Sequence, residues 1–265
     1  MSVPVALTIA GSDSSGGAGI EADLKTFSAL GVYGACAITA VTAQNTTGVF
    51  AIHDVPADVI AAQIDAVFTD LDVGAVKIGM LVTAPAIDAV AAALDRYRSR
   101  NVVLDPVMIA SSGERLLRED ALGALRGLIR RARVITPNLP EAAALLDAPP
   151  ARDEAEMRGQ AEKLLARGAG TVLITGGHAS GPESVDLLVE AGRCLRLAAP
   201  RVATKNTHGT GCTLASALAA GLAKGLSLDE AARQAKIYVS AALAAADRLA
   251  IGAGRGPLHH FHAWW

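Results

Sequence analysis

Short runs of apolar, often β-branched residues alternate along this chain with longer segments in which apolar residues recur at helical spacing. A strand covered on both faces is apolar throughout, whereas a helix buries one stripe of its surface, so the runs predict strands and the longer segments predict helices. The expected strands are Val3–Ile9, Ala35–Val41, Ala75–Ile78, Val102–Leu104, Val134–Thr136 and Thr171–Thr175. The expected helices are Ala18–Leu30, Ala57–Thr69, Pro85–Ser99, Asp120–Arg131, Pro140–Leu146 and Asp153–Arg167.

The last third of the chain departs from this alternation. Two short segments, Val185–Glu190 and Cys194–Ala198, are joined by a turn and predict a hairpin at the edge of the sheet. Two helices are expected after it, near Gly209–Lys224 and Leu228–Leu249, and a capping-box pattern at Ser227 opens the second. The whole pattern predicts an α/β protein with a three-layer α/β/α fold and a mostly parallel central sheet that carries an antiparallel edge hairpin. No repeat or linker interrupts it, so we expect a single domain over residues 1–265.

Composition narrows the class of protein. Of the 265 residues, 51% are hydrophobic, which is ample for a large core, and the net charge of −2 gives no electrostatic case for binding nucleic acid or an anionic membrane. No apolar run is long enough to cross a bilayer, and the first residues lack the basic start of a signal peptide. The cysteines Cys36, Cys194 and Cys212 are too few and too scattered for a disulfide framework or a structural zinc site. We therefore expect a cytoplasmic protein.

Polar and glycine-rich segments follow the expected strands again and again. They are Gly11–Gly19, Thr42–Asn45, Gly79–Met80, Asp105–Met108, Thr136–Glu141 and Thr175–His178. In layered α/β proteins, ligands bind beyond the carboxyl ends of the parallel strands, so these segments predict a substrate cleft along one rim of the sheet. The first of them does not fit the GxxxxGK[ST] pattern, which excludes a P-loop.

The segment TKNTHGTGCTLASALAAGLAKG, residues 204–225, places Gly209, Thr210, Gly211 and Cys212 at the start of a small-residue helix. A helix start offers unpaired backbone N–H groups and the positive end of the helix dipole, which suit a phosphate or an oxyanion. The same field is expected to favour the thiolate of Cys212. Without the other segments, a glycine-rich helix start of this kind is often no more than a tight turn.

Several polar residues allow two interpretations. Gln44 is either a satisfied core amide or a reader of a heterocycle edge, since an amide presents a donor and an acceptor together. Asp105 follows an apolar run, and a buried carboxylate there needs a partner such as magnesium. Asn138 and Glu141 suit capping of the helix that follows them, which is the commoner use of such residues.

The C-terminal tail HHFHAWW contains His259, His260 and His262, but their spacing fits no usual zinc pattern. A packed tail is the expected arrangement. Trp264 and Trp265 are expected to anchor the end of the chain, either on this molecule or at a subunit contact.

Together these segments resemble the hydroxymethylpyrimidine/phosphomethylpyrimidine kinases of thiamine biosynthesis, which belong to the ribokinase-like superfamily. The matching text runs through AGSDSSGGAGIEADLKTFSALGVYG, TAQNT, KIGML, VVLDPVM, ITPNLPEA, TKNTHGTGCTL and the tail, and so covers essentially the whole chain in order. The cysteine in the helix-start loop is specific to this branch, because many sugar kinases of the superfamily carry aspartate there.

The resemblance implies transfer of phosphoryl groups from ATP, with Mg²⁺, to 4-amino-5-hydroxymethyl-2-methylpyrimidine and then to its monophosphate. It implies that the pyrimidine is held by Gln44, the Val41–Thr42 backbone, Gly11, Asp23, Met80 and Val107. Nucleotide and phosphates would be received by Asn138, Glu141, Thr175, Gly177, Lys205 and Thr207, with Asp105 and Glu141 organising the metal. Gly209, Thr210, Gly211 and Cys212 would form the anion hole, where Cys212 orients the substrate hydroxyl or takes its proton. A homodimer is also implied.

One departure from the family pattern concerns the second phosphorylation. Relatives often carry lysine where this chain has Thr175, and a hydroxyl is a weaker partner for phosphate than an ammonium group. Lys205 is expected to compensate.

Three alternatives remain open on the sequence. A pyridoxine/pyridoxal kinase would use the same scaffold for a similar hydroxymethyl heteroaromatic, although Gln44 favours the pyrimidine. A binding protein that senses the pyrimidine without turnover would not need the intact GTGC segment. A sugar kinase is disfavoured by the missing loop aspartate.

Overall fold

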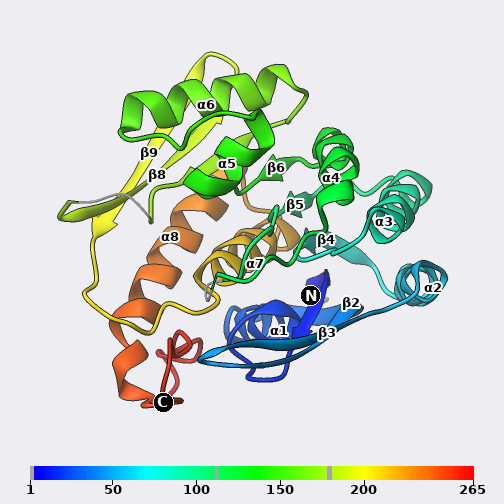
Figure 1. Ribbon diagram of the computed structural model, residues 1–265, viewed down its shortest axis with the longest axis horizontal. Helices are drawn as coiled ribbons and strands as arrows, with labels where there is room; N and C mark the ends of the chain where they lie inside the picture. Colours follow the sequence, from blue (N-terminus) through cyan, green and yellow to red (C-terminus); the bar gives the residue numbers. More distant parts are fainter. Residues whose placement is uncertain (1–2, 111–112, 178–180) are drawn as a thin grey trace.

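The computed structural model describes residues 3–110, 113–177 and 181–265. Within these residues, nine strands form one sheet in the order β3-β2-β1-β4-β5-β6-β7-β8-β9 (Figure 1). The strands are β1 Val5–Asp13, β2 Tyr33–Asn45, β3 Gly48–Asp54, β4 Val73–Ile78, β5 Val102–Leu104, β6 Val134–Ile135, β7 Val172–Thr175, β8 Glu183–Glu190 and β9 Arg193–Pro200. The helices are α1 Gly19–Ala29, α2 Ala57–Phe68, α3 Ala84–Tyr97, α4 Leu122–Leu128, α5 Leu139–Leu146, α6 Glu154–Ala166, α7 Thr210–Ala223 and α8 Leu228–Ala244.

The six central strands, β2, β1, β4, β5, β6 and β7, are parallel, and both edges of the sheet are antiparallel. The predicted α/β class and the β8–β9 edge hairpin are therefore confirmed. Strand β3 was not predicted. Most of its residues are exposed, Phe50 to 69%, so it lacks the buried apolar run by which the other strands were found.

The two faces of the sheet are buried in separate apolar clusters because successive strand residues point to opposite sides. Leu7 and Ile9 of β1 belong to the cluster beneath α2–α6. Ala6, the residue before Leu7, points to the other side and belongs to the cluster beneath α1, α7 and α8. Figure 1 shows these two groups of helices on the two sides of the sheet, which gives the predicted three layers.

Some boundaries differ from the expected ones. β1 and β2 continue through Asp13 and Asn45, so polar residues expected in loops are held by strand pairing. Helix α8 ends at Ala244, and a 3₁₀ turn over Ala246–Arg248 replaces the last expected turn. The C-terminal tail folds back there, since the His259 N–H donates to the Ala242 carbonyl.

The tail is anchored by histidines and not by tryptophans. His259 and His260 are buried, and the Tyr238 hydroxyl of α8 donates to the His260 carbonyl at 2.6 Å. Trp264 and Trp265 are 70% and 71% exposed, so the expectation that they bury the end of the chain on this molecule is wrong. The described part of the chain contains no helix that is both long and apolar enough to cross a membrane.

Candidate active site

The carboxyl ends of the parallel strands bring the polar segments to one rim. Asp13 of β1 lies beside Thr42 of β2 in the strand register. Asp105 follows β5 directly, and its N–H donates to the Ile78 carbonyl at the end of β4. Asn138, after β6, forms a parallel bridge with Thr175 of β7. These residues are far apart in the chain and meet because parallel strands end at the same edge.

Helix α7 begins at the middle of this rim. Gly209 precedes the helix with φ of 81°, and a Cβ there would overlap the Gly17 carbonyl, so both the conformation and the space require glycine. A Cβ on Gly211 would lie 3.7 Å from Asp105 Oδ2. The start of α7 therefore lies beside Asp105, and a helix start is suited to an anion, although the Thr210 N–H already donates to the Thr207 carbonyl at 3.3 Å.

Cys212 lies in this first turn, but the expectation that its thiolate is favoured is wrong for the protein alone. Burial raises the pKa of the Cys212 thiol to about 12, although the ammonium group of Lys77 opposes the shift. Removal from water disfavours the charged form by more than Lys77 and the hydrogen bond from the Gly19 backbone support it. The thiol is therefore neutral at physiological pH.

Asp23 lies below the rim and does not line an open pocket. Its side chain is fully buried and forms an ion pair with Lys77 at 2.8 Å. The hydroxyls of Thr8 and Ser216 each donate to its carboxylate at 2.6 Å. The implied direct contact between Asp23 and the pyrimidine does not fit this position, because all these partners already enclose the carboxylate.

Lys77 was missed by the sequence interpretation, which assigned it only to an apolar strand. Burial alone would lower its pKa, but the Asp23 carboxylate holds the pKa of Lys77 above its usual range. A Cβ on Gly79 would lie 2.8 Å from its Nζ, so the ammonium group sits just beneath the strand end. The available signal was a lysine inside the otherwise apolar run VGAVKIGM.

Two buried carboxylates, Asp105 beside the start of α7 and Glu141 in the first turn of α5, influence one another. Burial raises the pKa of Asp105 to about 6, with Lys77 opposing the shift and Asp23 reinforcing it. Burial, followed by the Asp105 carboxylate, raises the pKa of Glu141 well above its usual range. Two buried carboxyl groups that disfavour each other's ionisation suit a divalent cation.

No group of three or more His, Cys, Asp or Glu side chains that could hold a metal occurs within the described residues. Mg²⁺ needs no such cage, because it is usually held by one or two carboxylates together with substrate phosphates and water. Asp105 and Glu141 therefore fit Mg²⁺ by their chemistry.

The predicted nucleotide side is built around the ends of β6 and β7. Asn138 and Glu141 form a complete capping box at the start of α5, with both hydrogen bonds at 2.9 Å. The capping interpretation is thus confirmed, whereas a contact with nucleotide stays a prediction. Thr175 ends β7 next to Asn138, and its N–H donates to the Pro137 carbonyl. His178, the last residue of the polar segment expected here, lies outside the described residues.

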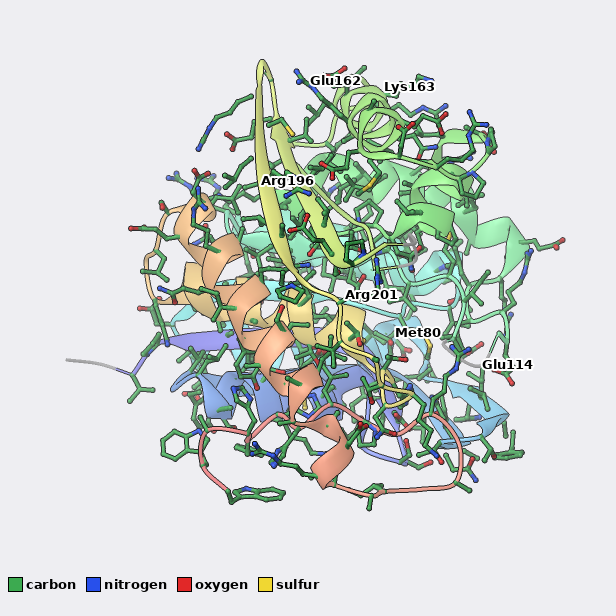
Figure 2. All side chains as sticks on the ribbon, turned by 90° about the vertical axis from the view of Figure 1, so that its left-hand side faces the viewer. Met80, Glu114, Glu162, Lys163, Arg196 and Arg201 are labelled. Atoms are coloured by element: carbon green, nitrogen blue, oxygen red, sulfur yellow. The ribbon has the colours of Figure 1, made fainter. Side chains whose placement is uncertain are left out.

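Three further residues hold the Thr175–Gly177 loop and were not found from the sequence. The Gly176 N–H donates to Asp186 at 3.0 Å, and Asp186 is paired with Lys236 of α8 at 2.7 Å. Arg201 donates to the Gly177 carbonyl at 2.8 Å. Figure 2 shows Arg201 at the inner end of the β8–β9 hairpin, with Arg196 farther out along it.

The predicted pyrimidine side lies at the ends of β1, β2 and β4. Met80 is 8% exposed, and a Cβ on Gly11 would overlap its terminal methyl, so the two residues face the same small space. Val107 packs against the apolar cluster that contains Met80. Thr42 of β2 contacts both the Ser12 carbonyl, at 3.0 Å, and the Gln44 side chain, at 3.1 Å.

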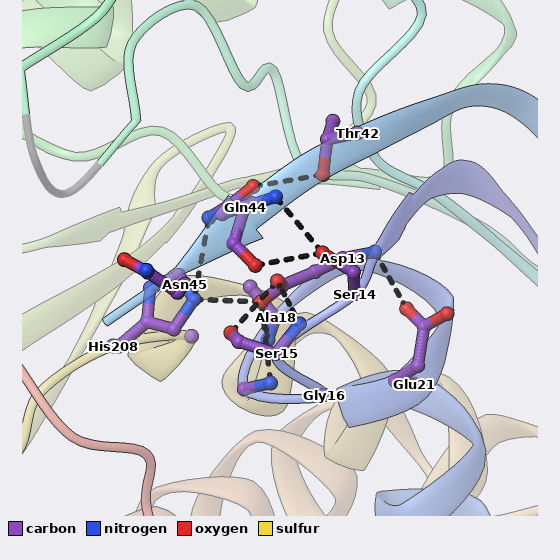
Figure 3. Close-up of polar contacts among 12 residues, drawn as sticks. Asp13, Ser14, Ser15, Gly16, Ala18, Glu21, Thr42, Gln44, Asn45 and His208 are labelled. Atoms are coloured by element: carbon purple, nitrogen blue, oxygen red, sulfur yellow. Dashed lines mark hydrogen bonds and ion pairs between the residues drawn. The ribbon is translucent and has the colours of Figure 1, made fainter. Parts of the chain in front are cut away.

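Gln44 lies against a buried pair that sequence reasoning missed, Asp13 and His208 (Figure 3). His208 Nε2 lies 2.7 Å from Asp13 Oδ2 and 3.4 Å from the Gln44 side-chain nitrogen. Burial alone would raise the pKa of Asp13, but hydrogen bonds from His208 and Ser15 outweigh it and lower that pKa to about 2. The carboxylate is therefore ionised throughout the physiological range.

A pocket of about 430 Å³ opens beside Gln44 and His208. Lys205 and Arg255 lie on its wall, together with residues 45–47 and 253–254. Because Lys205 lines this pocket, it lies on the Gln44 side of the rim, and its role at the nucleotide stays a prediction. Thr207 is also exposed, and its carbonyl accepts the Thr210 hydroxyl at 2.7 Å, which ties it to the start of α7.

Comparisons with known proteins agree with this arrangement. The family model described as phosphomethylpyrimidine kinase matches residues 13–259. A hydroxymethylpyrimidine/phosphomethylpyrimidine kinase of Rhizobium meliloti is 59% identical over 262 residues, 98% of each chain. Among solved structures, the phosphomethylpyrimidine kinase of Clostridium difficile has a TM-score of 0.79 at 44% identity, over 89% of this chain and 97% of that one.

The same scaffold also occurs in pyridoxal kinases. An ADP complex of the pyridoxal kinase of Bacillus subtilis has a TM-score of 0.92 at 38% identity, with 99% of both chains covered. The match along nearly the whole chain, at this level of identity, shows that the protein belongs to the phosphomethylpyrimidine kinase family and has its ribokinase-like fold.

Proposed function

We propose that this kinase transfers the γ-phosphoryl group of ATP to the hydroxymethyl group of 4-amino-5-hydroxymethyl-2-methylpyrimidine, and then phosphorylates the monophosphate to the pyrophosphate, for thiamine biosynthesis. The observation that carries the proposal is the meeting of three features on one rim: the start of α7, the Asp105 carboxylate and the Gln44 amide. They supply an anion site, a metal-binding group and a reader of the aminopyrimidine edge.

In the first transfer, the substrate oxygen forms a bond to the γ-phosphorus while the bond from that phosphorus to the bridging oxygen breaks, and ADP and one proton leave. Such a reaction depends on positioning and on stabilising the charge of the phosphoryl group. We assign the second task to the start of α7 at Gly209–Cys212, which lies beside Asp105. A neutral Cys212 thiol can orient the substrate hydroxyl but is a poor proton acceptor, so we assign it to the anion hole.

We assign the nucleotide to the rim between α5 and the end of β7. Asn138, Glu141, Thr175 and Gly177 lie there, and the Thr175–Gly177 loop is held in place from two sides by Asp186 and Arg201. Asp105 and Glu141 would hold Mg²⁺ here, where the ion supplies neutralisation of the nucleotide phosphates. The similar kinase solved with ADP supports nucleotide use by this scaffold.

Pyridoxal phosphorylation is a second candidate function, because the TM-score of 0.92 was obtained with a pyridoxal kinase. The deciding experiment measures ADP release with ATP and Mg²⁺ for the hydroxymethylpyrimidine, its monophosphate and pyridoxal. Turnover of both pyrimidines in preference to pyridoxal supports the proposal. Turnover of the free alcohol alone would indicate that Thr175 has weakened the second step, and preference for pyridoxal would reverse the assignment. Tight binding of the pyrimidine without ADP release would indicate a sensor.

We further propose that the chain works as a single kinase domain in the cytoplasm, where ATP is available, and as a homodimer. The continuous nine-stranded sheet of the described residues supports the single domain. Exposed apolar side chains along β2 and β3, such as Val41 and Phe50, support a subunit contact.

A further inference from the structure

The Asp13 carboxylate is one of the most completely hydrogen-bonded groups on the rim. Oδ1 accepts from the N–H and the hydroxyl of Ser15, at 2.9 and 2.8 Å. Oδ2 accepts from the N–H groups of Gly17 and Ala18, at 3.2 and 2.9 Å. His208 Nε2, at 2.7 Å, is a further partner of Oδ2. A carboxylate with this many partners is fixed in position (Figure 3).

This carboxylate determines which ring nitrogen of His208 carries a proton. An ionised carboxylate can only accept hydrogen bonds, so His208 Nε2 must donate to Asp13. The same Nε2, now protonated, lies 3.4 Å from the amide nitrogen of Gln44. An amide nitrogen is a donor as well, and two donors do not bond.

Thr42, on the other side of the amide, can accommodate the same arrangement. Its hydroxyl has one proton and lies 3.0 Å from the Ser12 carbonyl, which only accepts. Donation to Ser12 leaves the Thr42 oxygen as an acceptor toward Gln44, 3.1 Å from the amide oxygen. Both neighbours are satisfied when the amide is turned by half a rotation, with its oxygen toward His208 and its nitrogen toward Thr42. Amide oxygen and nitrogen have the same shape and are assigned from such networks.

We propose that the Asp13–His208 pair, with Thr42 opposite, fixes the direction of the Gln44 amide and thereby sets the order of acceptor and donor that the substrate meets. The proposal rests on the proposed function, in which Gln44 reads the pyrimidine. When His208 and Thr42 each hold one side of the amide, one lone pair of its oxygen and one N–H of its nitrogen remain for the substrate. A 4-aminopyrimidine has the complementary order, an amino donor beside a ring-nitrogen acceptor. His208 and Asp13 are then positioning residues that determine specificity.

The 4-oxo analogue of the substrate provides the sharpest probe, because it presents the reverse order, an oxygen acceptor beside a ring N–H donor. An amide that can rotate would accept either compound, whereas a fixed amide rejects the analogue. Rejection by an unpaired buried polar group is large, on the order of a hundredfold or more in kcat/KM.

The experiment compares kcat/KM for the amino and oxo compounds, together with the KM for ATP, in the native chain and its variants. His208→Leu removes the donor and is expected to lower the amino-to-oxo preference at least about tenfold, with the KM for ATP unchanged. His208→Gln keeps an N–H near the Nε2 position and should restore most of the preference. His53→Leu, at an exposed histidine of β3, is the matched control and should leave the preference intact.

A purely structural role for His208 would lower both rates together and leave their ratio unchanged, and that result overturns the proposal. An unselective native chain overturns it as well. If the native chain releases no ADP with the aminopyrimidine, the proposed function itself has failed. The two failures are distinguishable, because the preference ratio can be measured only on an active enzyme. Should His208→Leu not fold, Asp13→Asn tests the same point, since a neutral partner no longer fixes the histidine proton, and an unchanged ratio there overturns the proposal.

Discussion

Lys77 and Asp23 show how a charged pair can be hidden inside a fold and still act on its active site. Both side chains are inaccessible to water, and both influence the pKa of Cys212 and Asp105 above them. Such a pair seldom adds stability relative to an apolar core, but removal of one partner leaves a buried charge uncompensated.

We therefore expect Lys77→Met to lower the free energy of unfolding by about 3–5 kcal/mol. Urea denaturation followed by circular dichroism measures it. The double variant Lys77→Met/Asp23→Asn should lose less of the free energy of unfolding than Lys77→Met alone, because no buried charge is then left unpaired. Lys163→Met, at an exposed lysine of α6, is the control and should change little. If the single and double variants lose the same free energy of unfolding, this account of the pair is contradicted.

The neutral thiol of Cys212 leads to a prediction about pH. Because the pKa of this thiol is raised to about 12, the group remains protonated over the working range of the enzyme. The pH profiles of kcat for the native chain and for Cys212→Ser should therefore have the same shape between about pH 6 and pH 9.5, with the variant lower by about tenfold or less. An alkaline limb that only the native chain shows would mean that a thiolate takes part.

At the scale of elements, the start of α7 depends on one glycine. An alanine at Gly209 meets two obstacles, the left-handed φ of 81° and the overlap with the Gly17 carbonyl. Gly225, after the same helix, has φ of 80° but open space around its Cβ position, so Gly225→Ala is a matched control for the backbone strain alone.

Gly209→Ala is expected to lower kcat by about a hundredfold, since even a small displacement of the anion site is costly in phosphoryl transfer. Gly225→Ala should lower the melting temperature somewhat but leave kcat within about twofold. Steady-state kinetics with thermal denaturation distinguishes the two effects. Similar kcat values in both variants would show that the helix start does not need its present position.

The carboxylates at the end of β5 and the start of α5 should make stability depend on pH. The pKa of Asp105 is about 6 in the fold, above its ordinary value of 3.8. Its favourable contribution is complete below about pH 4 and is lost as the pH rises through 6, because over this range the unfolded chain has released the proton that the fold still holds.

Without Mg²⁺, the stability of the native chain relative to Asp105→Asn should fall by about 3 kcal/mol between about pH 4 and pH 7. Added Mg²⁺ should recover stability in the native chain near neutral pH, and much less in the variant. Denaturation at a series of pH values, with and without the ion, measures both effects. A relative stability that rises with pH would contradict the raised pKa.

At the scale of the whole molecule, the proposed homodimer is open to direct measurement. The chain has a mass of 27.0 kDa, so light scattering after size-exclusion chromatography should give about twice that value. Phe50→Glu places a charge on the exposed β3 edge and should shift the protein toward the single-chain mass while its melting temperature changes little. A single-chain mass for the native protein at micromolar concentration would remove the proposal.

The sequence by itself determined the alternating architecture and the rim. Runs such as Val102–Leu104 can be recognised because burial on both faces leaves strands wholly apolar, and the polar residues after them, such as Asp105, must then lie at one edge. The Asn138–Glu141 cap could also be predicted from the sequence, since its partners are neighbours in the chain.

Tertiary structure alone decided which distant groups meet and what the meeting does to their charge. Asp13 and His208 are 195 positions apart, and no periodicity links them. The position of Asp23 under the rim, the neutral state of Cys212 and the exposure of Trp264 likewise depend on what surrounds each side chain. Sequence patterns report local backbone preference and burial, whereas hydrogen-bond partners and desolvation are properties of the packed whole.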